Sequence, residues 1–138
     1  MNAPRPAVIG LLDDDTDLLD TVAQMLALLG FEPHTFRTQD ALLAAVDHFP
    51  FEGFVLDWRL ASGTAARVVH ALRRSGTVPA PPIIVLSGNL PLGSTPVDEE
   101  LASVLALPQV RYRAKPCRTR ELAEDLWAGI HALRAATA

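Results

Sequence analysis

The hydrophobic positions of this chain fall into two alternating patterns. Short, continuous apolar runs are typical of strands covered on both faces, and apolar residues that recur every three or four positions are typical of amphipathic helices. The apolar runs predict strands at 7–12, 53–57 and 81–87, and two less apolar segments, 31–36 and 110–114, are predicted as further strands. The helices predicted to follow them are 16–29, 38–49, 63–76, 95–108 and 119–135.

The alternation of strands and helices predicts how the strands are ordered. Short strand-to-helix connections favour a parallel sheet with right-handed crossovers and helices on both faces. The first, third and fourth strands are almost entirely apolar and belong in the centre of the sheet. The second contains Pro33, which lacks a backbone donor, and the fifth is charged, so both belong at the edges. We therefore predict an α/β, doubly wound, five-stranded parallel sheet of order 2-1-3-4-5.

Polar residues indicate where several helices begin. Thr16 and Thr64 are placed to cap the first and third helices, and Thr95 is placed to cap the fourth, ahead of a proline. Asp15 and Asp17 are interpreted as acidic residues at the start of the first helix, where the helix dipole favours negative charge.

Composition and charge narrow the class of protein. The chain has 138 residues, of which 49% are hydrophobic. We expect a single domain over 1–138, with an ordered core of about 7–135 and no output domain. A net charge of −4 does not favour nucleic-acid binding. The only cysteine, Cys117, allows no internal disulfide, and no apolar stretch is long enough to span a membrane, so we expect a cytoplasmic protein without membrane contact.

Chemically active residues follow four of the five predicted strands. Asp13 and Asp14 come after the first strand, Asp57 ends the third, Ser87 ends the fourth and Lys115 follows the fifth. In a doubly wound sheet these carboxyl ends share one crevice, where ligands bind. Carboxylates gathered there need protons or a cation, and oxygen ligands suit Mg²⁺, which keeps positions for water and phosphate oxygens. A hydroxyl and a lysine opposite that ion would hold a phosphoryl group.

Four short segments, in this order, resemble the receiver domain of two-component response regulators, which has a flavodoxin-like fold. They are "LLDDD" at 11–15, "FVLD" at 54–57, "IIVLSG" at 83–88 and "YRAKP" at 112–116. The resemblance extends over nearly the whole chain. Each segment alone is a weak signal, but all four on the expected elements are specific.

The resemblance implies a phosphoacceptor site. Asp57 would take a phosphoryl group from a sensor histidine kinase or a phosphotransfer protein. Asp14 and Asp57 would coordinate Mg²⁺ directly and Asp13 mostly through water, with the backbone carbonyl of Arg59 as a further ligand. Mn²⁺ would be able to substitute. Such a protein would carry out phosphotransfer to itself and autodephosphorylation, and would not be a conventional turnover enzyme.

The resemblance also implies a switch. Lys115 would pair with the phosphoryl oxygens, Ser87 would move to bond one of them, and Tyr112 would follow inward. The Lys115–Pro116 bond is expected to be cis. The readout would be an altered surface on the fourth helix, fifth strand and fifth helix. An effector that the sequence does not identify would bind there, and a homodimer could form through the same surface.

Two loops depart from the family pattern. After Asp57, the segment Ala61–Ser62–Gly63 replaces the usual Pro–Gly-type turn. The stretch from Ser87 to Lys115 is longer than usual, with the extra residues expected within 89–96. The residues predicted to tune the phosphoryl lifetime are Trp58, Arg59, Gly88 and Asn89, with Arg59 reaching over the pocket mouth.

Two other functions compete with this interpretation. The segment "DDDTD" at 13–17 also fits a haloacid-dehalogenase-like aspartyl-phosphate phosphatase, in which Asp13 would be the nucleophile. That family normally needs a second acidic pair after its lysine, and here only Glu124 and Asp125 follow, inside a predicted helix. The other alternative is a binding module with this fold that never switches by phosphate. The complete acidic set and Lys115 argue against it.

Overall fold

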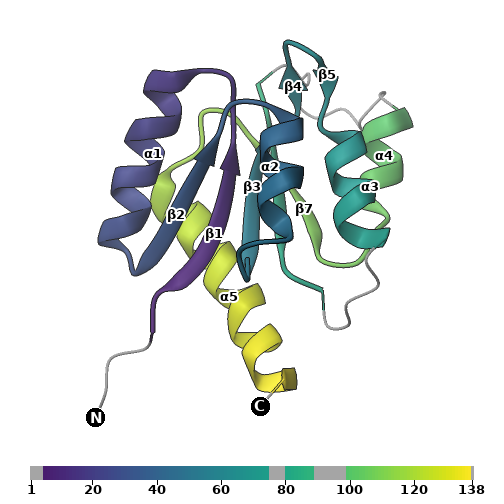
Figure 1. The fold of residues 1–138 in the computed structure, drawn as a ribbon. Coiled ribbons are helices and arrows are strands. Elements are labelled where there is room, and N and C mark those ends of the chain that lie inside the picture. The colour runs from purple at the N-terminus through teal and green to yellow at the C-terminus, as the bar shows by residue number, and fades with distance from the viewer. Residues whose placement is uncertain (1–4, 75–79, 89–98, 138) are drawn as a thin grey trace.

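The computed structural model describes residues 5–74, 80–88 and 99–137. Within them, one parallel sheet has the order β2-β1-β3-β6-β7, which is the predicted order 2-1-3-4-5 (Figure 1). Both strands predicted for the edges, including the one with Pro33, are edge strands. The strands of this sheet are β1 Ala7–Leu12, β2 Phe31–Phe36, β3 Gly53–Asp57, β6 Ile83–Ser87 and β7 Val110–Ala114.

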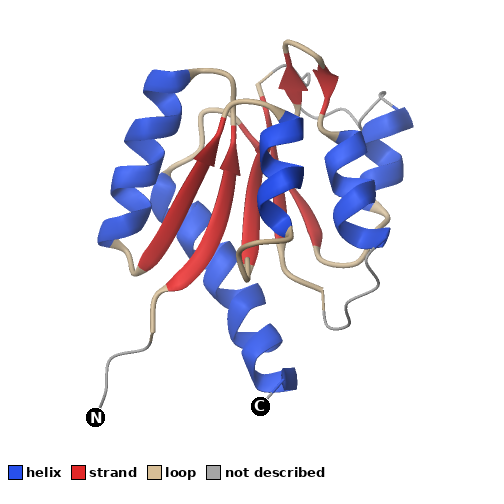
Figure 2. Cartoon of the chain, in the orientation of Figure 1, coloured by secondary structure: helices blue, strands red, loops and turns tan. Residues whose placement is uncertain are grey.

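Helices cover both faces of the sheet (Figure 2). Their bounds are α1 Thr16–Leu28, α2 Gln39–Val46, α3 Ala66–Arg74, α4 Glu99–Leu105 and α5 Thr119–Thr137. Helices α1 and α5 contribute buried residues to one apolar cluster, and α2, α3 and α4 contribute to a second. The doubly wound architecture predicted from the sequence is therefore confirmed. Among the described helices, none is long and apolar enough to cross a membrane.

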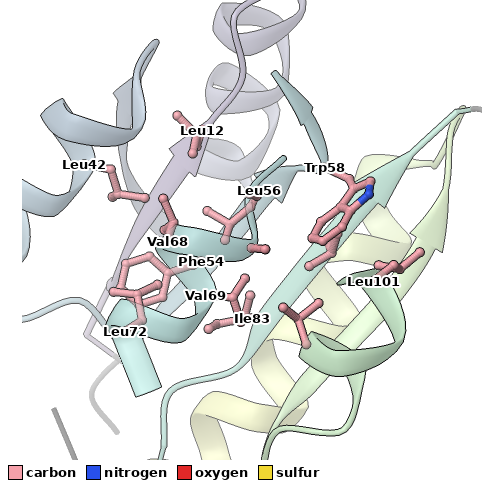
Figure 3. Packing of buried hydrophobic residues seen from close by; sticks show 14 of the residues in the cluster. Leu12, Leu42, Phe54, Leu56, Trp58, Val68, Val69, Leu72, Ile83 and Leu101 are labelled. Carbon is pink, nitrogen blue, oxygen red and sulfur yellow. The ribbon is translucent and has the colours of Figure 1, made fainter. Parts of the chain in front are cut away.

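The two clusters arise from the alternation of side chains along the central strands. Phe54 and Leu56 of β3 lie in the cluster under α2, α3 and α4, whereas Val55 between them lies in the cluster under α1 and α5. Figure 3 shows the first cluster, in which Leu42 of α2, Val68 of α3 and other labelled residues pack against these strands. A sheet buried on both faces explains why the central strands read as continuous apolar runs.

The first helix is capped one residue earlier than predicted. Asp15, not Thr16, is the N-cap, because its side chain accepts a hydrogen bond from the backbone N–H of Leu18 at 3.2 Å. Its carbonyl also accepts the first helical bond, from Leu19 N at 2.9 Å. The interpretation of Asp15 as a helix-start residue is confirmed, and the cap at Thr16 was wrong.

The predicted helix 63–76 begins later, because its first residues form a hairpin. β4 Arg59–Leu60 and β5 Gly63–Thr64 pair antiparallel, and α3 starts at Ala66. Gly63 has a φ of 125°, a conformation that other residues rarely adopt. Thr64 lies in β5, although its Oγ1 still accepts a hydrogen bond from Ala66 N at 3.4 Å. The cap at Thr95, the extra loop residues and the end of the predicted third helix lie outside the described residues.

Candidate functional site

The register of the sheet brings the predicted residues to one edge. Leu12 pairs with Leu56 across β1 and β3, so Asp13 and Asp57 follow side by side. Backbone hydrogen bonds fix the strand ends, from Asp13 N to Phe36 O at 3.2 Å and from Lys115 N to Ser87 O at 3.0 Å. The site is therefore held by paired backbone and not by free loops.

Lys115 connects two of the carboxylates. Its Nζ lies 3.1 Å from Asp57 Oδ1 and 3.3 Å from Asp13 Oδ2. Both aspartates are buried, with exposed fractions of 8% and 7%, and Lys115 is half-buried. The peptide bond between Lys115 and Pro116 is cis, as predicted.

The buried setting changes the proton affinity of both charged partners. Burial raises the pKa of Asp57 above its ordinary value; the hydrogen bond from Lys115 opposes this rise and the charge of Asp13 adds to it. Burial lowers the pKa of Lys115, but its hydrogen bond to Asp57 and the charges of both aspartates outweigh this and hold that pKa above its ordinary value. The lysine is thus kept charged beside an excess of carboxylates.

Three carboxylates form a site that fits a hard divalent cation. One oxygen each from Asp13, Asp14 and Asp57 lies within 4.8 Å of the others. The backbone N–H of Asp15 donates to Asp13 Oδ1 at 2.9 Å, and that of Ala61 donates to Asp14 Oδ2 at 2.8 Å. These bonds orient two of the carboxylates. Three acids against one lysine leave a net negative charge, and all-oxygen donors are those that Mg²⁺ prefers.

Ser87 and Tyr112 meet on the neighbouring strands. Ser87 is 2% exposed at the end of β6, and Tyr112 lies on β7 opposite Val85. The Tyr112 hydroxyl donates to the backbone carbonyl of Ser87 at 3.3 Å. Burial raises the pKa of the Tyr112 hydroxyl, which keeps it protonated as a donor.

Comparison with known proteins bears on the fold. Neither a family model nor a curated protein sequence matches the chain. Among solved structures, it is similar to a CheY-like response regulator receiver domain protein from Methanospirillum hungatei JF-1, with a TM-score of 0.80 and 22% identity over 95% of this chain and 98% of that one. The fold is that of response regulator receiver domains.

Other receiver structures agree with this assignment. The signal receiver domain of an HD domain-containing protein from Pseudomonas fluorescens Pf-5 has a TM-score of 0.79 and 18% identity, covering 99% of this chain and 96% of that one. A response regulator receiver protein from Sinorhizobium medicae WSM419 has a TM-score of 0.75 and 23% identity, covering 92% and 96%. The receiver fold thus extends over nearly the whole chain, as the sequence predicted.

The residues predicted to tune this receiver-fold site occupy different settings. Trp58 is 1% exposed and packs in the cluster that contains Leu101, as Figure 3 shows, so its indole does not line an open pocket mouth. Arg59 is exposed in β4. Gly88 lies against the lysine, since a Cβ there would be 3.7 Å from Lys115 Cβ. Asn89 lies outside the described residues.

The β4–β5 hairpin is the functional neighbour that the sequence did not predict. Its Ala61 N–H holds Asp14, Gln39 of α2 donates to Ser62 Oγ at 3.1 Å, and Thr64 Oγ1 donates to Glu100 Oε1 of α4. The sequence did contain one signal for this hairpin. Gly63, two residues after Ala61, can adopt the positive φ that a tight turn requires. The hairpin fastens the acidic site to α2 and α4 of the receiver fold.

The acidic pair that the phosphatase alternative requires is placed elsewhere. Asp125 accepts hydrogen bonds from the Arg113 guanidinium at 2.7 and 3.1 Å, and Glu124 is exposed on α5. Within the described residues, neither belongs to the acidic group around Asp57. The receiver fold therefore does not favour that alternative.

Proposed function

We propose that the chain is the phosphoacceptor receiver domain of a two-component phosphorelay. Asp57 takes a phosphoryl group from a histidine kinase or a phosphotransfer protein in a Mg²⁺-dependent reaction. The observation that carries the proposal is the ion pair between Lys115 Nζ and Asp57 Oδ1 at 3.1 Å, beside the carboxylates of Asp13 and Asp14. One nucleophile, one cation and a dication site are the parts that phosphoryl transfer needs.

The proposed chemistry is an in-line displacement. A carboxylate oxygen of Asp57 forms a bond to phosphorus, the P–N bond of the donor phosphohistidine breaks, and the imidazole leaves with the bonding electrons. When bound, Mg²⁺ supplies neutralisation of the charge on the phosphoryl oxygens. Lys115 contributes a second positive charge and orients Asp57, so that catalysis rests on positioning and electrostatics.

The proposed output is a switch beside Lys115, at the carboxyl ends of β6 and β7. Ser87 bonds a phosphoryl oxygen, and Tyr112 moves with it, which alters the surface of α4, β7 and α5. The hydrogen bond from the Tyr112 hydroxyl to the Ser87 carbonyl supports this proposal, because it couples the two residues. A downstream effector reads the altered surface, in the cytoplasm and without contact with nucleic acid.

We further propose that Arg59 supplies its backbone carbonyl as a ligand to the metal.

Intact-mass analysis after treatment with acetyl phosphate and Mg²⁺ tests the function. We expect one added phosphoryl group on the wild type and none on Asp57→Asn. Asp17→Asn is the matched control, because Asp17 is an exposed acid in the first turn of α1, and it should be modified as the wild type is. Modification of Asp57→Asn to the wild-type extent would contradict the proposal.

A further inference from the structure

The face formed by α1 and α5 carries an unusual amount of exposed apolar surface. Of the five large hydrophobic residues that are exposed within the described chain, four lie on α1 or just after it. They are Leu18, Met25, Leu28 and Leu29, and Leu28 is 86% exposed. Figure 1 shows α1 beside the sheet on the face that α5 also covers. Several exposed apolar side chains on one helix make this face a candidate interaction surface.

A groove of about 900 Å³ lies beside Leu28 on the same face. Its walls come from the end of α1 and from α5, and Trp127 forms part of them. The Trp127 indole N–H donates to the Leu29 carbonyl at 3.2 Å, and its ring packs against the Phe31 ring, tilted by 31°, with centroids 4.7 Å apart. The Arg134 guanidinium lies 5.6 Å from the indole centroid. The groove is thus lined by a fixed aromatic ring.

Charges on this face complement each other in a way that suits a second copy. Arg120 and Glu124 both line the groove and are exposed one turn apart on α5. Within the described chain, neither side chain forms an ion pair. A two-fold axis passing between them would place each guanidinium opposite the carboxylate of the other copy. The same operation would set the projecting Leu28 of each copy against the groove of the other.

The opposite edge of α5 is less suited to a dimer interface. There the charges of β7 and α5 are already paired within the chain, between Arg113 and Asp125 at 2.7 Å, Arg113 and Glu121 at 3.5 Å, and Arg111 and Asp125 at 3.6 Å. A dimer through α4, β7 and α5 would have to break these pairs or leave them unused. The α1–α5 face has both the apolar surface and the unpaired complementary charges.

We propose that the chain forms a two-fold dimer through the α1–α5 face, with Leu28 of each copy in the groove beside Trp127 of the other. The contact made by Leu28 uses the C-terminal end of α1, whereas Asp13 and Asp14 precede the N-terminal end of that helix. This contact also leaves the α4–β7–α5 surface free for an effector. The inference goes beyond the proposed phosphoacceptor function and does not depend on it.

Sedimentation velocity of the full chain, from micromolar to near-millimolar concentration, tests the proposal. We expect a dimer whose dissociation constant rises about tenfold or more in Leu28→Glu, because a charge would enter the apolar groove. Leu28 is 86% exposed, so the variant should keep the thermal unfolding midpoint of the wild type. Ala102→Glu is the control: Ala102 is exposed on α4, and the same change there should leave the dimer intact.

Charge reversal gives a second, independent test. Arg120→Glu and Glu124→Arg should each weaken the dimer, because each places like charges across the two-fold axis. The double variant should restore it, because the pairing is recreated with the signs exchanged. The proposal would be overturned by a wild type that stays monomeric at every concentration. It would also be overturned by one that associates only with an added histidine kinase or phosphotransfer protein. A dimer that dissociates in Ala102→Glu but not in Leu28→Glu would overturn it as well.

Discussion

Lys115 and Asp13 come from opposite ends of the sequence, yet Lys115 Nζ lies 3.3 Å from Asp13 Oδ2, because β1 and β7 end at the same edge of the sheet. The same ammonium lies 3.1 Å from Asp57. One cation therefore balances two buried carboxylates of the acidic site, and it competes for them with any dication.

Lys115→Met should bind Mg²⁺ more tightly. Removing the ammonium leaves the three carboxylates with a higher net negative charge, and we expect the dissociation constant for Mg²⁺ to fall by roughly tenfold. Isothermal titration calorimetry measures it directly. Arg118→Met removes an exposed cation from the following loop and should have little effect. Weaker or unchanged Mg²⁺ binding in Lys115→Met would show that the lysine does not compete for the site.

Glu52 should give the protein a pH-dependent stability. Its carboxylate accepts hydrogen bonds from the Arg134 guanidinium at 2.7 and 3.0 Å and from Arg5 at 3.0 Å. The Arg134 hydrogen bond lowers the pKa of Glu52, and burial only partly opposes it. Because the folded pKa is below the unfolded one, this stabilisation is present above the unfolded pKa and is lost as the pH falls through the folded pKa.

Glu52→Gln should therefore be less stable than the wild type at neutral pH by about 1 kcal/mol. The difference should close in acid, and urea unfolding at a series of pH values measures it. Glu124→Gln, at an exposed position on α5, is the control and should leave the free energy of unfolding of the monomer close to that of the wild type. A stability difference for Glu52→Gln that is constant with pH would rule out the charge as its source.

Thr64 should matter for stability through its hydroxyl. It donates to Glu100 of α4 and accepts from Ala66 N, so it joins the hairpin to two helices. Thr64→Val keeps the shape and removes both bonds, and we expect a loss of about 1 kcal/mol in the free energy of unfolding. Thr64→Ser keeps the hydroxyl and should recover most of it. A loss in Thr64→Ser with none in Thr64→Val would instead assign the effect to the methyl group.

The two tryptophans should differ in their access to solvent. Trp58 is 1% exposed, whereas Trp127 is half-buried beside the α1–α5 groove. Iodide cannot enter an apolar core, so Trp127→Phe, which leaves only Trp58, should be quenched several-fold less than Trp58→Phe. Circular dichroism verifies that both variants are folded. Similar quenching of the two would mean that Trp58 is not in the core.

Much of the fold followed from local patterns. Pro33 and the charges of 110–114 identified the edge strands, because an edge tolerates a missing donor and a solvated face. Once the order was set, the shared edge of parallel strands was enough to gather Asp13, Asp57 and Lys115. These predictions needed only the sequence of elements and no knowledge of side-chain packing.

The features that sequence reasoning missed depend on tertiary contacts. The hairpin is held by Asp14, Gln39 and Glu100, which come from three other parts of the chain. The burial of Trp58 did have a local signal, since it continues the alternation of Phe54 and Leu56 toward the same cluster. Its position beside Asp57 suggested a role at the site instead. Asp15, the N-cap of α1, precedes the predicted cap Thr16 by one residue, and errors of this size are usual at helix boundaries.

The central claim is that Asp57, and not Asp13, carries the phosphoryl group. Borohydride reduces an aspartyl phosphate to homoserine, so reduction after treatment with acetyl phosphate and Mg²⁺, followed by peptide sequencing by mass spectrometry, reports the modified position. The account predicts homoserine at position 57 and unchanged aspartate at positions 13 and 14. Homoserine at position 13 would contradict it and would favour the phosphatase alternative.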